Sequence, residues 1–268
     1  MATVPKHVEI ADALRSAIAD GTYPAGATIP RELDLATRYG VTRSTVRRAV
    51  ATLRAEGLVT PVKRRGTVVR DRTIRRRVGS DRYQREVEQI GQPHRPAETS
   101  FTADRHVAWT DYQLDREFEE MPASDDVAEW LALEPGTPVL ARRFVFRAAG
   151  VPEQLSTSYL PLSLVAGTAV ADPANEPWPG GNIAQLATLG IIVTRVRESV
   201  HARMPTVDEA RTLHIPDGVP VFAITRVMFT GTERDRPVEV AADIVIPADR
   251  TVLDYVIDLN PPQPGTDS

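Results

Sequence analysis

Residues 41–59, VTRSTVRRAVATLRAEGLV, predict one short helix with two unlike faces. The hydroxyl of Thr42 can cap its N-terminus, and Gly57 is suited to end it. Apolar residues recur at helical spacing on one side, which predicts that this side is buried against a small core. The other positions are mostly Arg, Ser and Thr, so the opposite side is either a solvated face or a surface that fits a partner. The apolar positions are Val46, Ala49, Val50 and Leu53.

The neighbouring segments restrict the fold further. Apolar spacing predicts a helix over residues 6–20 that ends at Gly21, and a second over residues 31–39 that ends at Gly40. After the third helix, residues 58–70, LVTPVKRRGTVVR, predict two short strands with a basic tip. Two helices joined by a short turn, with a basic hairpin after them, are typical of a winged helix-turn-helix.

Charge is unevenly distributed along the chain. Residues 1–77 contain 16 Lys and Arg and 7 Asp and Glu, a balance of +9, whereas the whole chain carries −4. Residues 78–268 therefore carry −13. A basic first part and an acidic remainder indicate one module that binds a polyanion and a second module with a different task.

The polar side of the third helix has the composition that the major groove of DNA requires. Arg can pair in bidentate fashion with guanine in that groove. The small residues Ser44 and Ala51 allow the backbone to approach closely, and the hydroxyls and free N–H groups of the first turn suit phosphate oxygens. The basic hairpin tip can reach the adjacent minor groove. The alternative is an Arg-rich amphipathic helix whose polar face is merely solvated.

These segments resemble a known family in their order, spacing and glycine positions. IADALRSAIADGTYPAGATIP, LATRYGVTRSTVRRAVATLRAEGLV and RRGTVV, within residues 5–70, are similar to the winged helix-turn-helix domain of GntR-family bacterial transcription regulators. The resemblance implies a homodimer that binds an inverted-repeat operator in double-stranded DNA. It places four residues at the family's DNA-contacting positions, Arg43, Ser44, Thr45 and Arg47. The candidate DNA-binding residues are Arg31, Thr42, Arg43, Ser44, Thr45, Arg47, Arg48, Lys63, Arg64, Arg65, the wing glycine Gly66, and Thr67.

Three residues depart from the family's pattern. Arg31 replaces the usual Ser before the second helix, and Leu33 replaces an Arg that often contacts DNA. At the wing, Arg64 replaces a frequent Gly and adds charge. We expect Arg31 to supply the missing cation from a neighbouring position, and the operator to differ from the family's common sequence.

The rest of the chain predicts an α+β domain with an antiparallel sheet. Strand-like runs at residues 140–146 and 151–159 surround the turn AAG, and runs at residues 219–229 and 238–246 predict a second strand pair. A helix is predicted over residues 182–189, after a loop rich in Pro and Gly. Further predicted elements are a strand over residues 191–202 and a short helix with a capping box at Thr206 and Glu209.

This region is similar to the effector-binding UTRA domain of the HutC-type branch of the GntR family, on the stretches VLARRFVFRAAGVPEQLSTSYLP and PVEVAADIVIPADR. The resemblance implies a chorismate-lyase-like antiparallel sheet with flanking helices and a small-molecule pocket beside the sheet. The predicted domains are a winged helix-turn-helix domain at residues 1–70, a linker at 71–80, an effector-binding and dimerisation domain at 81–260, and a disordered tail at 261–268.

The resemblance also predicts the kind of effector. Members that sense phosphosugars bind the phosphate with two arginines on the strand before the hairpin, and the sugar with a Glu. The register of the hairpin puts Phe144, Phe146 and Ser156 at those positions, which favours a small-molecule effector other than a phosphosugar. In the alternative register, Arg143 or Arg147 faces inward. Strand alternation and a helix N-terminus complete the effector-binding candidates, which are Arg142, Phe144, Phe146, Ser156, Ser158, Asn182 and Glu239.

Several classes of protein are excluded or disfavoured. The chain has no cysteine, so disulfides, thiolate catalysis and Cys-bound metal are excluded. No run approaches the ~20 apolar residues of a membrane span, and MATVPKHVEI has no signal-peptide core, so we expect a cytoplasmic protein without a membrane partner. We expect no metal and no cofactor, because the histidines lack metal-ligand spacing and no nucleotide-binding motif is present. The histidines are His7, His94, His106, His201 and His214.

Three hypotheses follow. The first is a dimeric transcriptional repressor whose affinity for its operator is modulated by a small molecule. The second is a lyase-like enzyme with a DNA-binding appendage, but no acid, base or nucleophile constellation supports it, so we expect no enzyme. The third is a protein that organises DNA without sequence preference.

Overall fold

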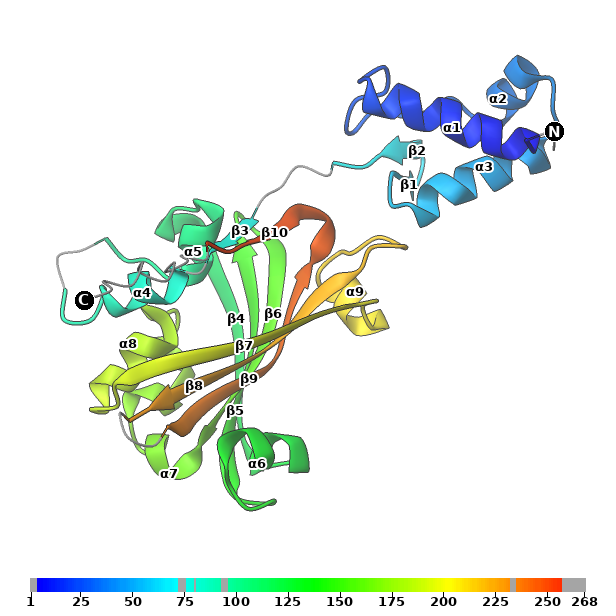
Figure 1. Cartoon of the computed structure of the whole chain (residues 1–268). Coiled ribbons are helices and arrows are strands. Elements are labelled where there is room, and N and C mark those ends of the chain that lie inside the picture. Colours follow the sequence, from blue (N-terminus) through cyan, green and yellow to red (C-terminus); the bar gives the residue numbers. More distant parts are fainter. Residues whose placement is uncertain (1–3, 72–75, 80, 93–95, 232–234, 257–268) are drawn as a thin grey trace, which may run out of the picture.

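The structure is a computed structural model, and its described residues form two domains (Figure 1). The described ranges are 4–71, 76–79, 81–92, 96–231 and 235–256. The sequence predictions that lie outside them concern the linker residues 72–75 and 80, His94, the tail 261–268, and residues 1–3, 93–95, 232–234 and 257–260 of the two predicted domains.

The first domain consists of three helices and a hairpin, as the sequence predicts. Val46, Ala49 and Leu53 are fully buried between the helices, and Val50 lies with them in one core. The predicted apolar side of the third helix is therefore confirmed as the buried side. The elements are α1 (Lys6–Ala19), α2 (Glu32–Tyr39), α3 (Arg43–Ala55), β1 (Val59–Val62) and β2 (Gly66–Val69).

The turn between α2 and α3 is fixed by local interactions. Gly40 has a φ of 63°, in the left-handed region that ends α2 without steric cost. Two residues later, the hydroxyl of Thr42 accepts a hydrogen bond from the Thr45 N–H at 3.3 Å and caps α3. These two features set the direction in which α3 leaves α2.

The second domain is built on a six-stranded sheet in the order β4-β5-β6-β9-β8-β7, in which all neighbouring strands are antiparallel. This confirms the predicted α+β class. The predicted hairpin at Ala149 and Gly150 joins β5 to β6, and both residues have positive φ. The strands are β4 (Tyr112–Pro122), β5 (Pro138–Ala148), β6 (Val151–Pro161), β7 (Val193–Arg203), β8 (Val221–Thr230) and β9 (Arg236–Pro247).

Helices cover both faces of this sheet. The neighbouring residues Val139 and Leu140 of β5 belong to different hydrophobic clusters, because successive side chains point to opposite faces. Val139 packs with α6, whereas Leu140 packs with α7 and α8. Helix α4 lies between α5 and α8 (Figure 1). The helices are α4 (Arg82–Val87), α5 (Ser100–Arg105), α6 (Asp125–Leu131), α7 (Leu162–Val165), α8 (Gly181–Thr188) and α9 (Val207–Thr212).

One part of the predicted linker belongs to the second domain. Residues Arg76–Gly79 form β3, which pairs in parallel with β10 (Thr251–Asp254). The segment between the domains is therefore shorter than the predicted 71–80. The pairing joins residues far apart in sequence, so no local pattern indicates it.

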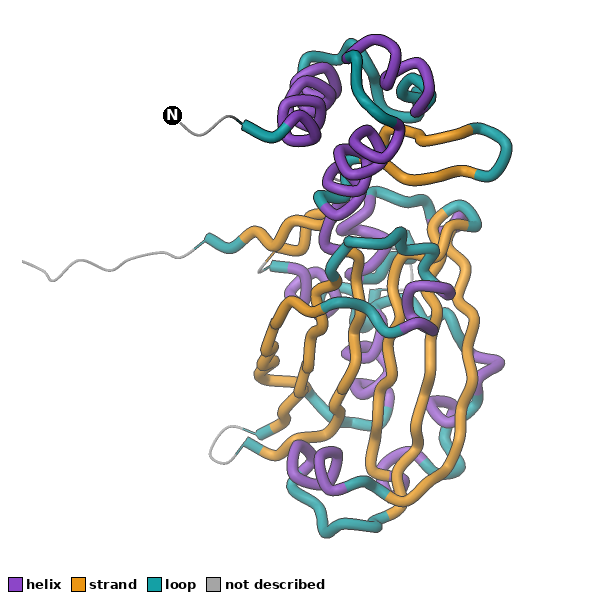
Figure 2. Tube along the Cα trace, turned by 90° about the vertical axis from the view of Figure 1, so that its right-hand side faces the viewer, coloured by secondary structure: helices purple, strands orange, loops and turns teal. Residues whose placement is uncertain are grey.

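The two domains touch at the C-terminal end of α3 (Figure 2). Arg70 contacts Asp249 in an ion pair whose side chains are only 7% and 11% exposed. Arg54 at the end of α3 pairs with Asp217 at 2.8 Å on the exposed rim of the same contact. A Cβ on Gly218 would lie 2.9 Å from the carbonyl oxygen of Arg54, so only glycine allows this close approach. The position of α3 is thereby tied to the second domain.

Candidate DNA-binding surface and ligand cavity

The side of α3 opposite the core is exposed and carries the predicted DNA-binding cations. Ten of the twelve predicted DNA-binding residues are exposed, and Thr45 and Thr67 are partly buried. Leu33, which departs from the family's pattern, is also exposed, at 62%. The exposed members at the start of α3 and along it are Thr42, Arg43, Ser44, Arg47 and Arg48.

A carboxylate on α2 holds two of these arginines. Glu32 accepts a hydrogen bond from Arg47 Nε at 2.9 Å, and Arg43 Nη2 lies 3.5 Å from the same oxygen. Such exposed pairs contribute little to stability. Glu32 instead orients Arg47 beside the first turn of α3. Glu32 was not among the residues predicted from the sequence.

The hairpin tip is held against the same domain. Arg65 Nη2 donates a hydrogen bond to the Gly26 carbonyl at 3.0 Å, and Thr28 forms a bridge with Val68 of β2. Gly66 has a φ of 96°, which favours glycine at the tip. The exposed cations of the tip, Lys63, Arg64 and Arg65, therefore project from a base that is fixed relative to α3.

The second domain contains a cavity of about 70 Å³ between the sheet and the layer of α4, α5 and α8. Five of the seven predicted effector-binding residues line it, and two do not. The five come from β5, β6 and α8, which are distant in sequence except at the hairpin. They are Phe144, Phe146, Ser156, Ser158 and Asn182.

One wall of this cavity is aromatic. Phe144 and Phe146 lie two residues apart on β5 and so share a face, with ring centroids 5.9 Å apart. The ring of Phe101 from α5 lies 5.2 Å from that of Phe146 and 5.4 Å from that of Tyr112 on β4. Trp178 adds a further aromatic side chain to the lining. Rings at these spacings pack favourably and leave an apolar surface toward the cavity.

Arg142 and Glu239, the two predicted residues that do not line the cavity, form hydrogen bonds with residues that do line it. Arg142 is fully buried, and donates hydrogen bonds to Gln185 Oε1 at 2.8 Å and to Ser158 Oγ at 3.1 Å. Burial lowers the pKa of its guanidinium. Glu239, also fully buried, accepts a hydrogen bond from Asn182 Nδ2 at 2.9 Å. Both residues therefore fix the orientation of polar groups at the cavity.

The alternative register, in which Arg143 or Arg147 faces inward, is wrong. Arg143 pairs with Glu119 at 2.9 Å, and Arg147 with Asp115 at 2.8 Å. Both arginines alternate with Phe144 and Phe146 along β5, so their side chains lie on the other face of the sheet.

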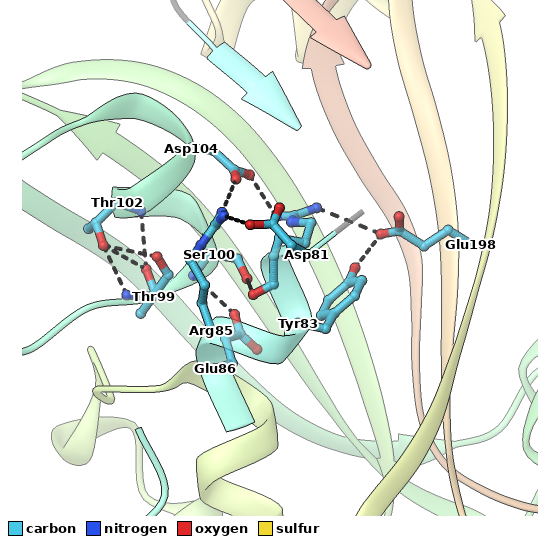
Figure 3. A network of polar contacts seen from close by, with 10 residues as sticks. Asp81, Tyr83, Arg85, Glu86, Thr99, Ser100, Thr102, Asp104 and Glu198 are labelled. Atoms are coloured by element: carbon cyan, nitrogen blue, oxygen red, sulfur yellow. Dashed lines mark hydrogen bonds and ion pairs between the residues drawn. The ribbon is translucent and has the colours of Figure 1, made fainter. Parts of the chain in front are cut away.

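The short helix α4 brings charged groups to the cavity that the sequence analysis did not identify (Figure 3). Arg82 lies 3.2 Å from Asp104 Oδ2 and 3.7 Å from Glu198 Oε1, and the Tyr83 hydroxyl donates to Glu198. One turn later, Glu86 Oε1 accepts a hydrogen bond from the Ser100 N–H at 3.1 Å. Burial raises the pKa of the Glu86 carboxyl above its usual value, although the Ser100 hydrogen bond opposes this shift.

Some of the missed residues had a recognisable signal. Tyr112 and Leu114 alternate with polar residues in YQLDREFEEM, which is typical of a half-buried strand. Phe101 lies in the first turn of α5, and a capping box of Thr99 and Thr102 marks the start of that helix. Glu86 had no signal, because a Glu on a short polar helix is usually solvated.

The described ranges contain neither a membrane-spanning helix nor a metal-ligand cluster. No helix there combines the length and the apolar character that crossing a membrane requires. No group of His, Asp and Glu in that part of the chain could hold a metal ion.

Known proteins match both domains. Residues 6–69 match the bacterial regulatory proteins of the gntR family, and residues 116–251 match the UTRA domain. An HTH-type transcriptional regulator of Streptomyces coelicolor is 31% identical over 84% of this chain and 84% of its own. The mannosyl-D-glycerate transport/metabolism system repressor MngR of Escherichia coli is 27% identical over 81% of this chain and 82% of its own.

A solved structure agrees with the sequence relatives. The crystal structure of a GntR-family transcriptional regulator is 33% identical, covers 96% of this chain and 98% of its own, and has a TM-score of 0.65. These relatives are transcription regulators and not enzymes, which confirms that prediction. The chain therefore belongs to the GntR family of bacterial regulatory proteins, in the HutC-type branch that joins a helix-turn-helix domain to a UTRA domain.

Proposed function

We propose that this chain is a cytoplasmic, dimeric repressor that binds an inverted-repeat operator, and that a small molecule in the UTRA cavity changes its affinity for DNA. The observation that carries the proposal is the exposed arginine face of α3, which lies beside a basic hairpin on one small core. Relatives named as repressors, MngR of Escherichia coli and PhnF of Mycolicibacterium smegmatis, support the direction of the effect.

Dimer geometry limits which operators can be bound. Two copies of α3 must enter major grooves about 34 Å apart, one turn of DNA, or a multiple of that distance. A ligand that changes the orientation of the helix-turn-helix domain in each protomer would alter the distance between the two copies of α3. It can shift the equilibrium only by its differential affinity for the two arrangements.

The contacts between the domains offer a route for this effect. Ser100 and Phe101 of α5 line the cavity, and Arg105 at the end of the same helix pairs with Glu153 at 2.6 Å. Arg250 Nε lies 3.3 Å from the same Glu153 oxygen. Its neighbour Asp249 contacts Arg70 of the first domain. We infer that a shift of α5 on ligand binding moves this chain of ion pairs.

DNase footprinting of the full-length protein on its own upstream sequences, or on DNA selected from a random pool, tests the proposal. A protected inverted repeat with half-sites one turn or a multiple apart is the expected result. Nearly equal affinity for such a repeat and for a scrambled duplex would instead favour a protein that organises DNA without sequence preference.

Arg47→Ala is expected to weaken operator binding by about 1–3 kcal/mol for each half-site and to relax specificity at one base pair of each half-site, because each protomer loses a bidentate base contact. Affinities for the operator and for variants at each position measure this. Arg38→Ala removes an equal charge from the exposed end of α2 and serves as the control. Equal losses on operator and scrambled DNA would contradict a base-reading role for Arg47.

Arg65→Ala is expected to weaken binding evenly across sequences, because the wing arginine would neutralise a phosphate. The slope of log K against log salt concentration should fall by about 1.8 for the dimer, because each protomer loses one phosphate contact worth about 0.9. Fluorescence anisotropy over a series of salt concentrations gives this slope. An unchanged slope would place Arg65 away from the DNA backbone.

A further inference from the structure

One carboxylate oxygen at the cavity has no hydrogen-bond partner among the described residues. It is Oε2 of Glu86, a side chain that lines the cavity and is only 6% exposed. The other oxygen, Oε1, already accepts from the Ser100 N–H. A buried acceptor without a partner is costly, and more so when it is charged, so a ligand that donates to it recovers part of that cost.

The first turn of α8 approaches this carboxylate without covering it with a side chain. A Cβ on Gly181 would lie 3.1 Å from Glu86 Oε1 and 3.4 Å from Oε2, so any other residue there would cover the carboxylate. Gly181 and Asn182 both line the cavity. The side-chain amide of Asn182 donates a hydrogen bond to Glu239, which fixes its orientation at the cavity.

The arginines that line the cavity are already paired with carboxylates. Arg82 contacts Asp104 and Glu198, and Arg226 Nη2 lies 2.9 Å from Glu239 Oε1. The Nε atoms of Arg82 and Arg226 have no hydrogen-bond partner among the described residues. An anionic ligand would nevertheless have to share both guanidiniums with the carboxylates that already pair with them, and it would lie beside Glu86. A phosphate or carboxylate group is disfavoured for this reason.

The aromatic wall of the cavity is suited to a flat apolar body. Phe101, Phe144 and Phe146 present aromatic rings, and aromatic pairs stabilise each other beyond the burial of their area. The cavity, at about 70 Å³, is smaller than the about 150 Å³ that holds benzene in an engineered protein cavity. A ring that enters must displace part of the wall, and Phe101 belongs to α5, the helix that carries Arg105.

From these contacts we propose that the effector is a planar aromatic molecule without negative charge, whose N–H or O–H group donates a hydrogen bond to Glu86 Oε2. This inference rests on the proposed function, because it names the ligand class of the same cavity. The aromatic wall binds the ring of the ligand. Glu86 selects among such ligands those whose N–H or O–H group is placed to donate to Oε2.

Indole and 1-methylindole are the probes, because they differ chiefly in whether the ring nitrogen carries a hydrogen. Titration of the full-length protein, followed by ligand-observed NMR or calorimetry, is expected to show indole bound at least about tenfold more tightly. This is the lower end of the value of a hydrogen bond to a charged acceptor. Equal affinities, or no binding of indole, would overturn the proposal.

Variants locate the effect at Glu86. In Glu86→Gln, the amide oxygen can still accept the hydrogen bond from the Ser100 N–H. The amide NH₂ group, a donor, then takes the place of Oε2, so the preference for indole over 1-methylindole should disappear. Glu86→Ala removes the acceptor and should have the same result. Glu88→Gln on the exposed end of the same helix is the matched control and should keep the preference. Retention of the preference in Glu86→Gln, with the fold intact by circular dichroism, would overturn the assignment.

A phosphosugar, glucosamine 6-phosphate, separates this inference from the proposed function. If it binds the cavity and alters operator affinity while indole does not, the ligand class is wrong and the regulatory function stands. If the footprint itself is absent, the proposed function fails regardless of which probe binds.

Discussion

Glu153→Ala is expected to lower the free energy of unfolding of the second domain by about 3–5 kcal/mol. Glu153 is 2% exposed, and its Oε2 contacts Arg105 at 2.6 Å and Arg250 at 3.3 Å. Removing one member of a buried ion pair is strongly destabilising, because desolvated positive charge loses its main counter-charge. For a domain of this size, the melting temperature should fall by roughly 10 °C.

Urea unfolding and thermal melting followed by circular dichroism measure this loss. Glu119→Ala, which removes a carboxylate from an exposed pair with Arg143 on the same sheet, is the control and should change little. Glu153→Gln keeps an acceptor without the charge and should lose less than Glu153→Ala. Similar small losses in all three variants would show that the Glu153 contacts are not desolvated in solution.

The first domain could be predicted almost completely, because its determinants are local. Thr42 and Gly40 are cap residues whose partners lie within a few positions, and the burial of Val46 and Leu53 follows from helical spacing. The predicted hairpin likewise needs only a short basic turn between β-branched residues. None of these features depends on a contact between distant parts of the chain.

The second domain could be predicted only where a pattern is local. The family resemblance and the register of the local hairpin placed Phe144 and Phe146 at the ligand positions, and the structure puts both at the cavity. The β3–β10 pair and the burial of Glu86 had no such signal. Glu86 is buried because α8, about a hundred residues later, approaches it at Gly181. The sequence of α4 by itself contains nothing that distinguishes this side chain from a solvated one.

Asp249→Ala is expected to release the first domain from the second while both remain folded. The Arg70–Asp249 pair is largely buried, and its two residues come from different domains. Loss of the carboxylate should weaken the contact between the domains by about 3 kcal/mol. The ratio of molecules with the domains in contact to molecules with them apart should then fall more than about a hundredfold. Neither domain loses a core residue, so the melting temperature of each should change little.

Distances between spin labels measure this release. The chain contains no cysteine, so Lys6→Cys on α1 and Asp208→Cys on α9 give two unique labels at exposed positions. Asp249→Ala should broaden the distance distribution between them. Asp217→Ala breaks the exposed Arg54 pair at the same contact and should leave the distribution narrow.

The same variant separates two views of how a ligand could act. If the ion-pair route transmits the signal, a ligand that alters operator affinity in the wild-type protein should alter it little in Asp249→Ala. A typical coupling of 1–3 kcal/mol, 5–150-fold, would then fall toward onefold. An undiminished ligand effect in a protein with a broadened distance distribution would show that the signal does not pass through the Arg70–Asp249 contact.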